Sequence, residues 1–255
     1  MRFAIGAQPV QVNVRTQTEL LRNLKDRLVS GKGFSVATLN LDHLVKLSWS
    51  TSFSKAYSAQ TFVTADGRPI VSLSRLAGQP VELIPGSELI QPICRIAAQI
   101  NVPIALLGST QDALDRAAQK LQDDHPGLQV AASLPPSSAF DPDGPEADEL
   151  IATLRRSGAR LCFLALGAPK QERFAARALV ELPNVGFLSI GAGLDFIAGQ
   201  QKRAPLWMRK IALEWLWRTL ENPARMAPRY ARCFAILPKL TWMALRTRFE
   251  SDPAI

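Results

Sequence analysis

The sequence predicts an α/β fold: a Rossmann-like, mostly parallel sheet with helices on both faces, followed by a basic helical C-terminal appendage. Short apolar, β-prone runs alternate with amphipathic helical stretches, and 255 residues with 47% hydrophobic content can bury a sizeable core. Lys and Arg are concentrated near the end of the chain. We therefore expect an α/β domain at 1–199 and the appendage at 200–255.

The strands and helices follow one another at the spacing of crossover connections. Because a strand–helix–strand unit returns the chain to the same edge of the sheet, such strands pair in parallel. Ligands of these folds bind outside the carboxyl ends of the strands. The sequence predicts strands within 34–40, 61–66, 103–108, 128–133, 161–167 and 185–193, and helices within 16–29, 112–124 and 147–157.

Polar residues and glycines gather where the expected strands end. Glycine lets the backbone approach a ligand closely, and a helix start presents free N–H groups to phosphate. The pattern favours a pocket for a nucleotide or a sugar phosphate. The residues at these strand ends are Thr38, Asn40, Asp66, Gly67, Gly108, Ser109, Thr110, Gly167, Lys170, Gln171, Glu172, Gly191, Gly193 and Asp195.

Each of these features also has a purely structural interpretation. A glycine after a strand is often a turn residue, and the GST at 108–110 fits neither common phosphate-binding motif. Asp66, before Gly67, is either a turn residue or a general base. The proline-rich segment 133–148 is either a plain connector or a cover over the site.

The positive charge belongs to the C-terminal part of the chain. Residues 200–248 contain eleven Lys or Arg and two acids, whereas the remainder holds 19 basic and 20 acidic residues. This indicates an anionic partner at that end: phosphate groups, nucleic acid or an acidic lipid surface. An apolar stripe beside basic residues is formed by Trp242, Leu245 and Phe249. This pattern is typical of a helix lying on an anionic bilayer. It also fits an ordinary packed helix with a solvated basic edge. Pro223 is expected to interrupt the helical segment.

Neither a disulfide framework nor a zinc site is expected. Cys94, Cys162 and Cys233 form no Cys-X-X-Cys pair, and the two histidines lie far apart in the sequence. The N-terminus lacks the apolar core of a signal peptide, and no run approaches about 18 apolar residues. The expected compartment is the cytoplasm.

Several segments, in this order and at these separations, make the pattern specific: TLN, TADG, GST, SLPPSSAFDPDGPEAD, ALGAPKQE, GAGLDFIAGQQKRAP, EWLWR and NPARMAPRY. From about Asn13 to Arg232 the chain resembles the WecG/TagA/CpsF glycosyltransferases, glycosyltransferase family 26. GAPKQE and the combination of RAP with EWL are specific signatures.

The resemblance implies a compact Rossmann-like catalytic domain with an appendage that docks at the membrane. It implies an inverting hexosyl- or N-acetylhexosaminyl-type transfer from a nucleotide donor, usually a UDP-sugar, to a sugar on undecaprenyl diphosphate, in surface polysaccharide synthesis. The expected location is peripheral, on the inner face of the cell membrane. The expected partners are the UDP-sugar, the undecaprenyl-diphosphate-linked acceptor and an anionic membrane surface, without nucleic acid; the transferred sugar and the oligomeric state stay open.

The resemblance also implies roles for single residues. Asp66 matches the proposed catalytic base, which takes the proton of the acceptor hydroxyl, with Thr38 beside it and Asn40 close by. Gln171 matches a donor-site residue. The appendage arginines proposed to grip diphosphate match Arg218, Arg225 and Arg229. The expected substrate-binding set is completed by Gly108, Gly167, Lys170, Glu172, Gly191, Asp195 and Arg203.

No metal or other cofactor is expected. The Asp-X-Asp motif with which many glycosyltransferases hold a metal occurs only at 141–143, in the proline-rich segment, so arginines would stabilise the leaving group. Leu83 and Glu88 stand where family members often have Arg and Asp. We expect both to lie away from the base and to bear on the choice of donor or acceptor.

Other classes of protein explain only part of the sequence. A nucleic-acid-binding module would account for the basic, tryptophan-rich end, but it needs neither Asp66 nor GAPKQE. A Rossmann dehydrogenase would carry GxGxxG after its first strand, and that motif is absent. The alternative function is therefore a non-catalytic basic α/β protein that binds a membrane or nucleic acid.

Overall fold

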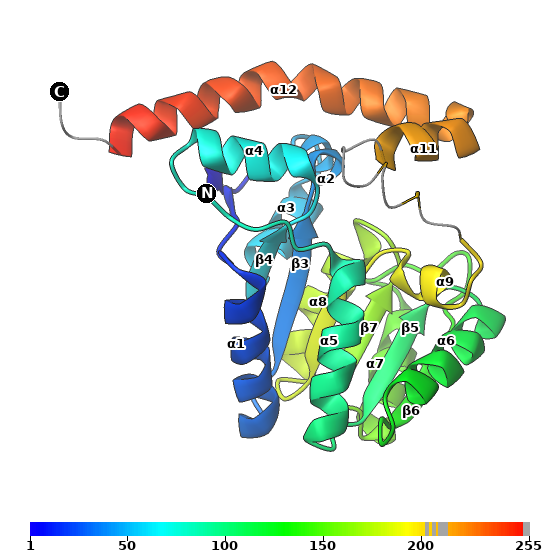
Figure 1. The fold of residues 1–255 in the computed structure, drawn as a ribbon. Helices are drawn as coiled ribbons and strands as arrows, with labels where there is room; N and C mark the ends of the chain where they lie inside the picture. Colours follow the sequence, from blue (N-terminus) through cyan, green and yellow to red (C-terminus); the bar gives the residue numbers. More distant parts are fainter. Residues whose placement is uncertain (202–203, 206–207, 209–213, 252–255) are drawn as a thin grey trace.

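The computed structural model describes residues 1–201, 204–205, 208 and 214–251, and it confirms the expected α/β architecture (Figure 1). Its main sheet has the strand order β4-β3-β8-β7-β5-β6, and every neighbouring pair is parallel. A short antiparallel pair, β1 (Arg2–Phe3) and β2 (Val10–Gln11), precedes it. The strands of the main sheet are β3 (Phe34–Leu39), β4 (Phe62–Ala65), β5 (Ile104–Gly108), β6 (Val130–Leu134), β7 (Leu161–Ala165) and β8 (Gly186–Ser189).

Helices cover both faces of this sheet. On one face α1, α5, α6 and α9 pack over a single core, and on the other α7 and α8 cover β5, β7 and β8, while α2, α3 and α4 pack beside β3 and β4. The described helices of the α/β part are α1 (Gln17–Ser30), α2 (Leu41–Leu47), α3 (Thr51–Ser58), α4 (Arg68–Leu76), α5 (Gly86–Gln99), α6 (Gln111–Asp124), α7 (Pro145–Ser157), α8 (Lys170–Glu181) and α9 (Gly193–Ile197).

The central strands are apolar at successive positions because both faces of the sheet are covered. In β5, Ile104 and Leu106 enter one core cluster, whereas Ala105 and Leu107 enter the other. All four side chains are fully buried. Burying a leucine or isoleucine stabilises the fold by roughly 1.5–3 kcal/mol, so the runs that predicted the strands also supply the core.

The appendage consists of α11 (Glu214–Glu221) and α12 (Pro223–Ser251). The interruption expected at Pro223 is confirmed, because α11 ends before it and α12 begins with it. Leu240 and Ala244 are buried in the core shared with α2 and α4, so one side of α12 is packed. None of the described helices is both long and apolar enough to cross a bilayer.

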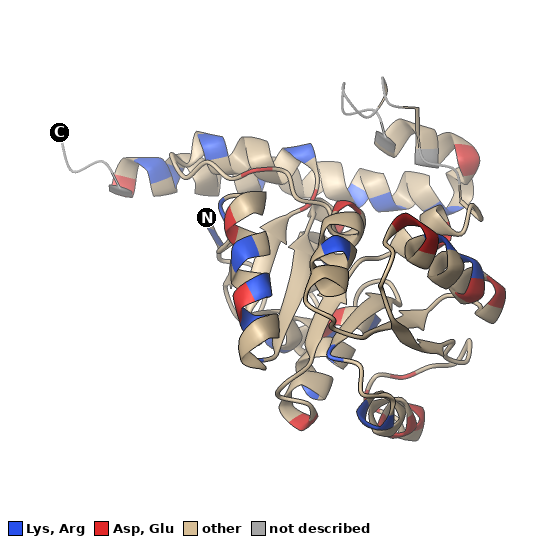
Figure 2. Ribbon diagram, turned by 60° about the horizontal axis from the view of Figure 1, so that its bottom comes forward, with Lys and Arg blue, Asp and Glu red and all other residues tan. Residues whose placement is uncertain are grey.

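The opposite side of α12 is exposed. Trp242 and Phe249 have 69% and 71% of their surface accessible. Figure 2 shows Lys and Arg recurring along this helix, with few acidic residues between them. One side of α12 is thus packed and the other presents an apolar and basic surface, and the binding of that surface to a bilayer stays a prediction.

Candidate active site

The site lies where the neighbouring strands β3 and β4 end. Leu39 and Ala65 are register partners, so the next residues, Asn40 and Asp66, leave the sheet at the same level. The Asp66 Oδ2 atom lies 3.5 Å from Thr38 Oγ1 and 3.4 Å from Asn40 Nδ2, at the long end of hydrogen-bond distances. The fold therefore brings together the three residues that the sequence placed at or beside the base.

Asn40 has its amide orientation fixed by the helix that follows it. Asn40 is the N-cap of α2, and its Oδ1 accepts the backbone N–H of His43 at 3.0 Å. Since the oxygen faces the helix start, the Nδ2 group faces Asp66. One residue thus ends the strand, starts the helix and orients the candidate base.

A buried aromatic pair supports the end of β3. The Tyr57 hydroxyl donates to the Thr38 carbonyl oxygen at 2.9 Å and lies 2.8 Å from His43 Nδ1. The hydroxyl has one proton, which it gives to the carbonyl, so Nδ1–H of His43 must be the donor in the second bond. Burial lowers the pKa of His43 to about 3, which keeps the imidazole neutral. Burial, with the charges of Glu172 and Asp66, raises the pKa of Tyr57 well above its usual value.

The ends of β7 and β8 are joined by Gln171. Its side chain is 2% exposed: Oε1 accepts the Gly191 N–H at 3.2 Å, and Nε2 donates to Glu172 Oε1 at 2.8 Å. Burial raises the pKa of Glu172 to about 7, against the opposing hydrogen bond from Gln171. Gly167 has a φ of +70° just before α8, which begins at Lys170. The predicted donor-site residues are thus neighbours, and the Gln171 amide makes protein contacts.

The end of β5 is tied to α9. A Cβ atom on Gly108 would lie 2.4 Å from the Ala165 carbonyl oxygen, and its φ is +122°, so glycine is required there for packing. The Asp195 carboxylate accepts hydrogen bonds from Ser109 Oγ at 2.5 Å and from Gln201 Nε2 at 2.9 Å. Gly108 and Asp195 therefore shape this edge of the sheet through contacts within the chain.

The appendage reaches the site through Arg229. Its Nη2 atom lies 3.0 Å from Asp42 Oδ2, in the first turn of α2. Arg225, at the start of α12, is exposed. The prediction for Arg203 falls outside the described residues, and so does that for the side chain of Arg218. Sequence reasoning missed Asp42, although its place two residues after the N-cap of a helix is a recognisable signal.

The proline-rich segment is a connector packed against α8. Phe140 is buried in edge-to-face contact with Phe174. Arg173 lies 3.6 Å from Asp141 Oδ1 and also pairs with Asp143, so both carboxylates of the Asp-X-Asp motif face a guanidinium. Within the described part of the chain, no cluster of three His, Cys, Asp or Glu could hold a metal ion.

The expectation that Leu83 lies away from the base is wrong. Leu83 forms a parallel bridge with Ala65, the residue before Asp66. The next residue, Ile84, donates its N–H to the Ala65 carbonyl at 2.8 Å. After α4 the chain therefore returns beside the end of β4, and it leaves the Leu83 side chain 39% exposed there. Glu88 lies farther on, in the first turn of α5.

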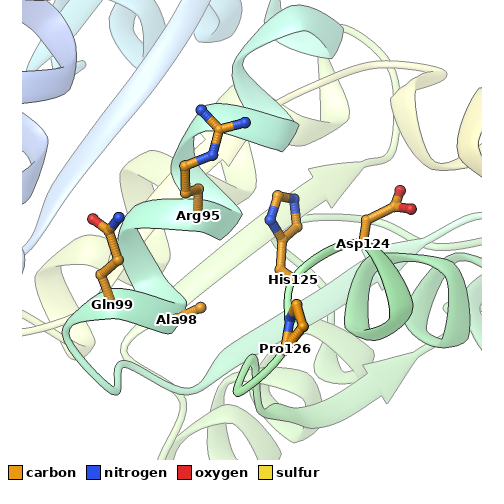
Figure 3. A pocket seen from close by; sticks show the side chains of 6 residues that line it. All are labelled: Arg95, Ala98, Gln99, Asp124, His125 and Pro126. Atoms are coloured by element: carbon orange, nitrogen blue, oxygen red, sulfur yellow. The ribbon is translucent and has the colours of Figure 1, made fainter.

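A separate cavity of about 290 Å³ opens near the amino-terminal ends of strands β5 and β6 (Figure 3). Its lining comes from the carboxyl-terminal ends of α5 and α6, which lead into the amino ends of β5 and β6. His125 Nε2 is 2.6 Å from Gln91 Oε1, and Asp124 pairs with Lys120. These groups bind one another, far along the strands from Asp66.

Comparison with known proteins finds matches over most of the chain. A model described as "Glycosyl transferase WecG/TagA/CpsF family" matches residues 7–253. The chain is similar to two Bacillus proteins, each named N-acetylglucosaminyldiphosphoundecaprenol N-acetyl-beta-D-mannosaminyltransferase. It is 28% identical to that of Bacillus spizizenii strain W23 over 227 residues, which are 89% of this chain and 84% of the relative. It is 26% identical to that of Bacillus subtilis strain 168 over 205 residues, 78% of each chain.

Proposed function

The chain belongs to the WecG/TagA/CpsF family of glycosyl transferases, and from that membership we propose that it moves a sugar from a UDP-sugar to a sugar carried on undecaprenyl diphosphate, with inversion. The names of the two Bacillus relatives give the first substrates to test: N-acetylglucosaminyl diphosphoundecaprenol as acceptor and N-acetylmannosamine as the transferred sugar. A panel of UDP-sugars then identifies the donor.

The observation that carries this proposal is the position of Asp66, held by Thr38 and Asn40 at the carboxyl edge of the sheet. The acceptor hydroxyl oxygen forms a bond to the anomeric carbon while the bond from that carbon to UDP breaks. The hydroxyl proton passes to the Asp66 carboxylate, and the electron pair of the broken bond leaves with UDP. Attack opposite to the leaving group inverts the configuration, which requires one base on the acceptor side.

The departing UDP needs cations or N–H donors where its negative charge grows. We assign this role to the arginines of the appendage: Arg229, which pairs with Asp42 in the helix after β3, and Arg225, one turn earlier on α12. Lys170, at the start of α8, and the glycines at the strand ends face the donor in this proposal. The carboxylates at 141–143 are paired with Arg173, which supports chemistry without a metal held there.

The proposed place of action is the inner face of the membrane, where the lipid-linked acceptor is held. The exposed Trp242 and Phe249 of α12, next to Arg246 and Arg248, supply the apolar and cationic groups that an anionic bilayer binds.

Replacing Asp66 tests the proposed base. Asp66→Asn keeps the shape of the side chain but cannot accept the proton, so transfer should fall by at least about 100-fold. Transfer from UDP-N-acetylmannosamine to a short-chain N-acetylglucosaminyl diphospholipid is measured by product formation, and thermal unfolding checks the fold. Asp143→Asn is the matched control, because that carboxylate is exposed and lies in the proline-rich segment. Near-normal transfer by Asp66→Asn would refute the assignment of Asp66 as the base.

A further inference from the structure

Asp42 joins three separate parts of the molecule. Its Oδ2 atom lies 2.9 Å from Lys46 Nζ, in the same helix α2, and 3.0 Å from Arg229 Nη2, in α12. Lys46 Nζ also donates to the Ala168 carbonyl oxygen at 3.0 Å, in the loop between β7 and α8. One carboxylate thus links the end of β3, the loop after β7 and the appendage.

The three charged groups are partly withdrawn from water. The side chain of Asp42 is 12% exposed, that of Lys46 26% and that of Arg229 30%. Burial alone would raise the pKa of Asp42, but the hydrogen bond from Lys46 and the charge of Arg229 outweigh it and hold the pKa below its usual value. Such pairs are screened less by salt than pairs on an open surface, so the contact restrains where Arg229 lies.

Apolar contacts hold α12 along much of its length. Cys233, one turn beyond Arg229, is buried, and so are Leu240 and Ala244, eleven and fifteen positions beyond Arg229. Near its amino-terminal end, α12 also contacts α11 through the ring pair of Tyr230 with Trp215. These apolar contacts place the helix, but they do not fix where the guanidinium of Arg229 lies. Asp42 contacts that guanidinium, two residues after Asn40, which itself reaches Asp66.

We propose that Asp42 is a positioning residue that holds Arg229 of the appendage beside the base, in place for the diphosphate of the substrate. The inference rests on the proposed function, because it takes from it the contact between Arg229 and diphosphate. The carboxylate is not itself a phosphate ligand, since two anions repel. Asp42 acts through the cation that it holds, and Lys46 offsets its charge so that the cluster stays net positive.

A double-mutant cycle tests this assignment. Asp42→Asn should lower kcat/KM for the diphospholipid acceptor about tenfold, mainly through KM, and Arg229→Gln should do the same. In the Arg229→Gln background, Asp42→Asn should cost about twofold or less, because the group it positions is gone. Asp42→Glu should restore part of the loss. Asp124→Asn is the control. Asp124 also pairs with a lysine four positions away in its helix, Lys120, but it lies at the amino-terminal ends of the strands, so this change should leave kcat and KM unaltered.

Hydrogen exchange gives a readout that does not need catalysis. Amides of residues 223–232 should exchange faster in Asp42→Asn and in Arg229→Gln than in the wild type, and at the wild-type rate in Asp124→Asn. Unchanged exchange and unchanged kcat/KM in Asp42→Asn would overturn the inference while leaving the proposed function intact, since the wild type would still transfer the sugar. If Asp42→Asn lowered kcat/KM by the same factor in the wild type and in the Arg229→Gln variant, the inference would also be overturned, because Asp42 would then act without Arg229. Absence of sugar transfer by the wild type would instead refute the proposed function, and the exchange result would still decide whether Asp42 restrains α12.

Discussion

At the scale of single residues, the interior next to the site holds polar groups whose protonation depends on burial. Glu172 is fully buried at the start of α8 and has its pKa raised to about 7, whereas His43 has its pKa lowered to about 3. The two groups affect stability in opposite directions. Below pH 6.5 the unfolded chain protonates His43 while the folded chain does not, so the His43 contribution falls as the pH falls.

Glu172 should make the folded state less stable as the pH rises. Below about pH 4.5, Glu172 is protonated in both the folded and the unfolded state. Between about pH 4.5 and 7 the unfolded chain loses this proton while the folded chain keeps it, so the free energy of unfolding falls. Above about pH 7 it levels off. The Glu172→Gln variant has no carboxyl group to titrate at this position. The difference between its free energy of unfolding and that of the wild type should therefore rise from pH 4.5 to 7. Urea unfolding over that range measures it, with the exposed Glu149→Gln as control. A pH-independent difference would contradict the assignment.

At the scale of elements, α12 serves two environments. Its packed side places Leu240 and Ala244 in a core with residues of α2 and α4, and its open side leaves Trp242 and Phe249 in water. Pro223 sets the start of this helix, because a proline at the first position needs no hydrogen-bond donor. Exposed aromatic side chains beside basic residues are the groups with which our proposal places this side on an anionic membrane.

Removing the exposed aromatic side chains should therefore weaken membrane binding. The double variant Trp242→Ser, Phe249→Ser should bind vesicles that contain anionic lipid at least about tenfold more weakly, since each aromatic group contributes roughly 1.5–3 kcal/mol when buried. Co-sedimentation with vesicles measures the affinity. Val180→Ser provides the control, because Val180 of α8 is 81% exposed but lies outside the appendage. Equal binding by the double variant and wild type would refute the membrane role of this face.

At the scale of the whole molecule, our proposal divides the chemistry between the two parts of the chain. The α/β part holds the proposed base Asp66 and the glycine-bearing strand ends, and the appendage holds Arg229, which pairs with Asp42, and Arg225 one turn earlier. The net charge of +8 is thus concentrated where an anionic leaving group and an anionic lipid would meet the protein.

This division of roles predicts transfer that does not depend on a divalent metal. With arginines neutralising the departing UDP, an excess of EDTA should leave the initial rate within about twofold of the untreated enzyme, and added Mg²⁺ or Mn²⁺ should not raise it further. The assay uses the full chain after dialysis against the chelator. Loss of activity that Mg²⁺ restores would show that a metal stabilises the leaving group.

The sequence by itself determined the six strands of the main sheet, the helices α1, α6 and α7, the helical character of the appendage, and the family. It also showed that the candidate site residues of the α/β part lie at or after the ends of these strands. These features depend on local periodicity and on short segments such as TADG and GAPKQE, which are visible without a fold. The family resemblance implied that Thr38 and Asn40 lie beside Asp66, and the structure confirms these positions at the ends of two neighbouring parallel strands.

Only the tertiary structure decided which distant side chains meet. The bonds from Tyr57 to Thr38, the bridge of Leu83 to Ala65 and the pair of Asp42 with Arg229 join residues from different elements, and no periodic pattern encodes them. Such contacts depend on how α3, the return after α4 and the appendage pack against the sheet. Packing is a property of the whole set of buried surfaces, so the sequence named the candidate groups, and the fold showed which contacts hold them in place.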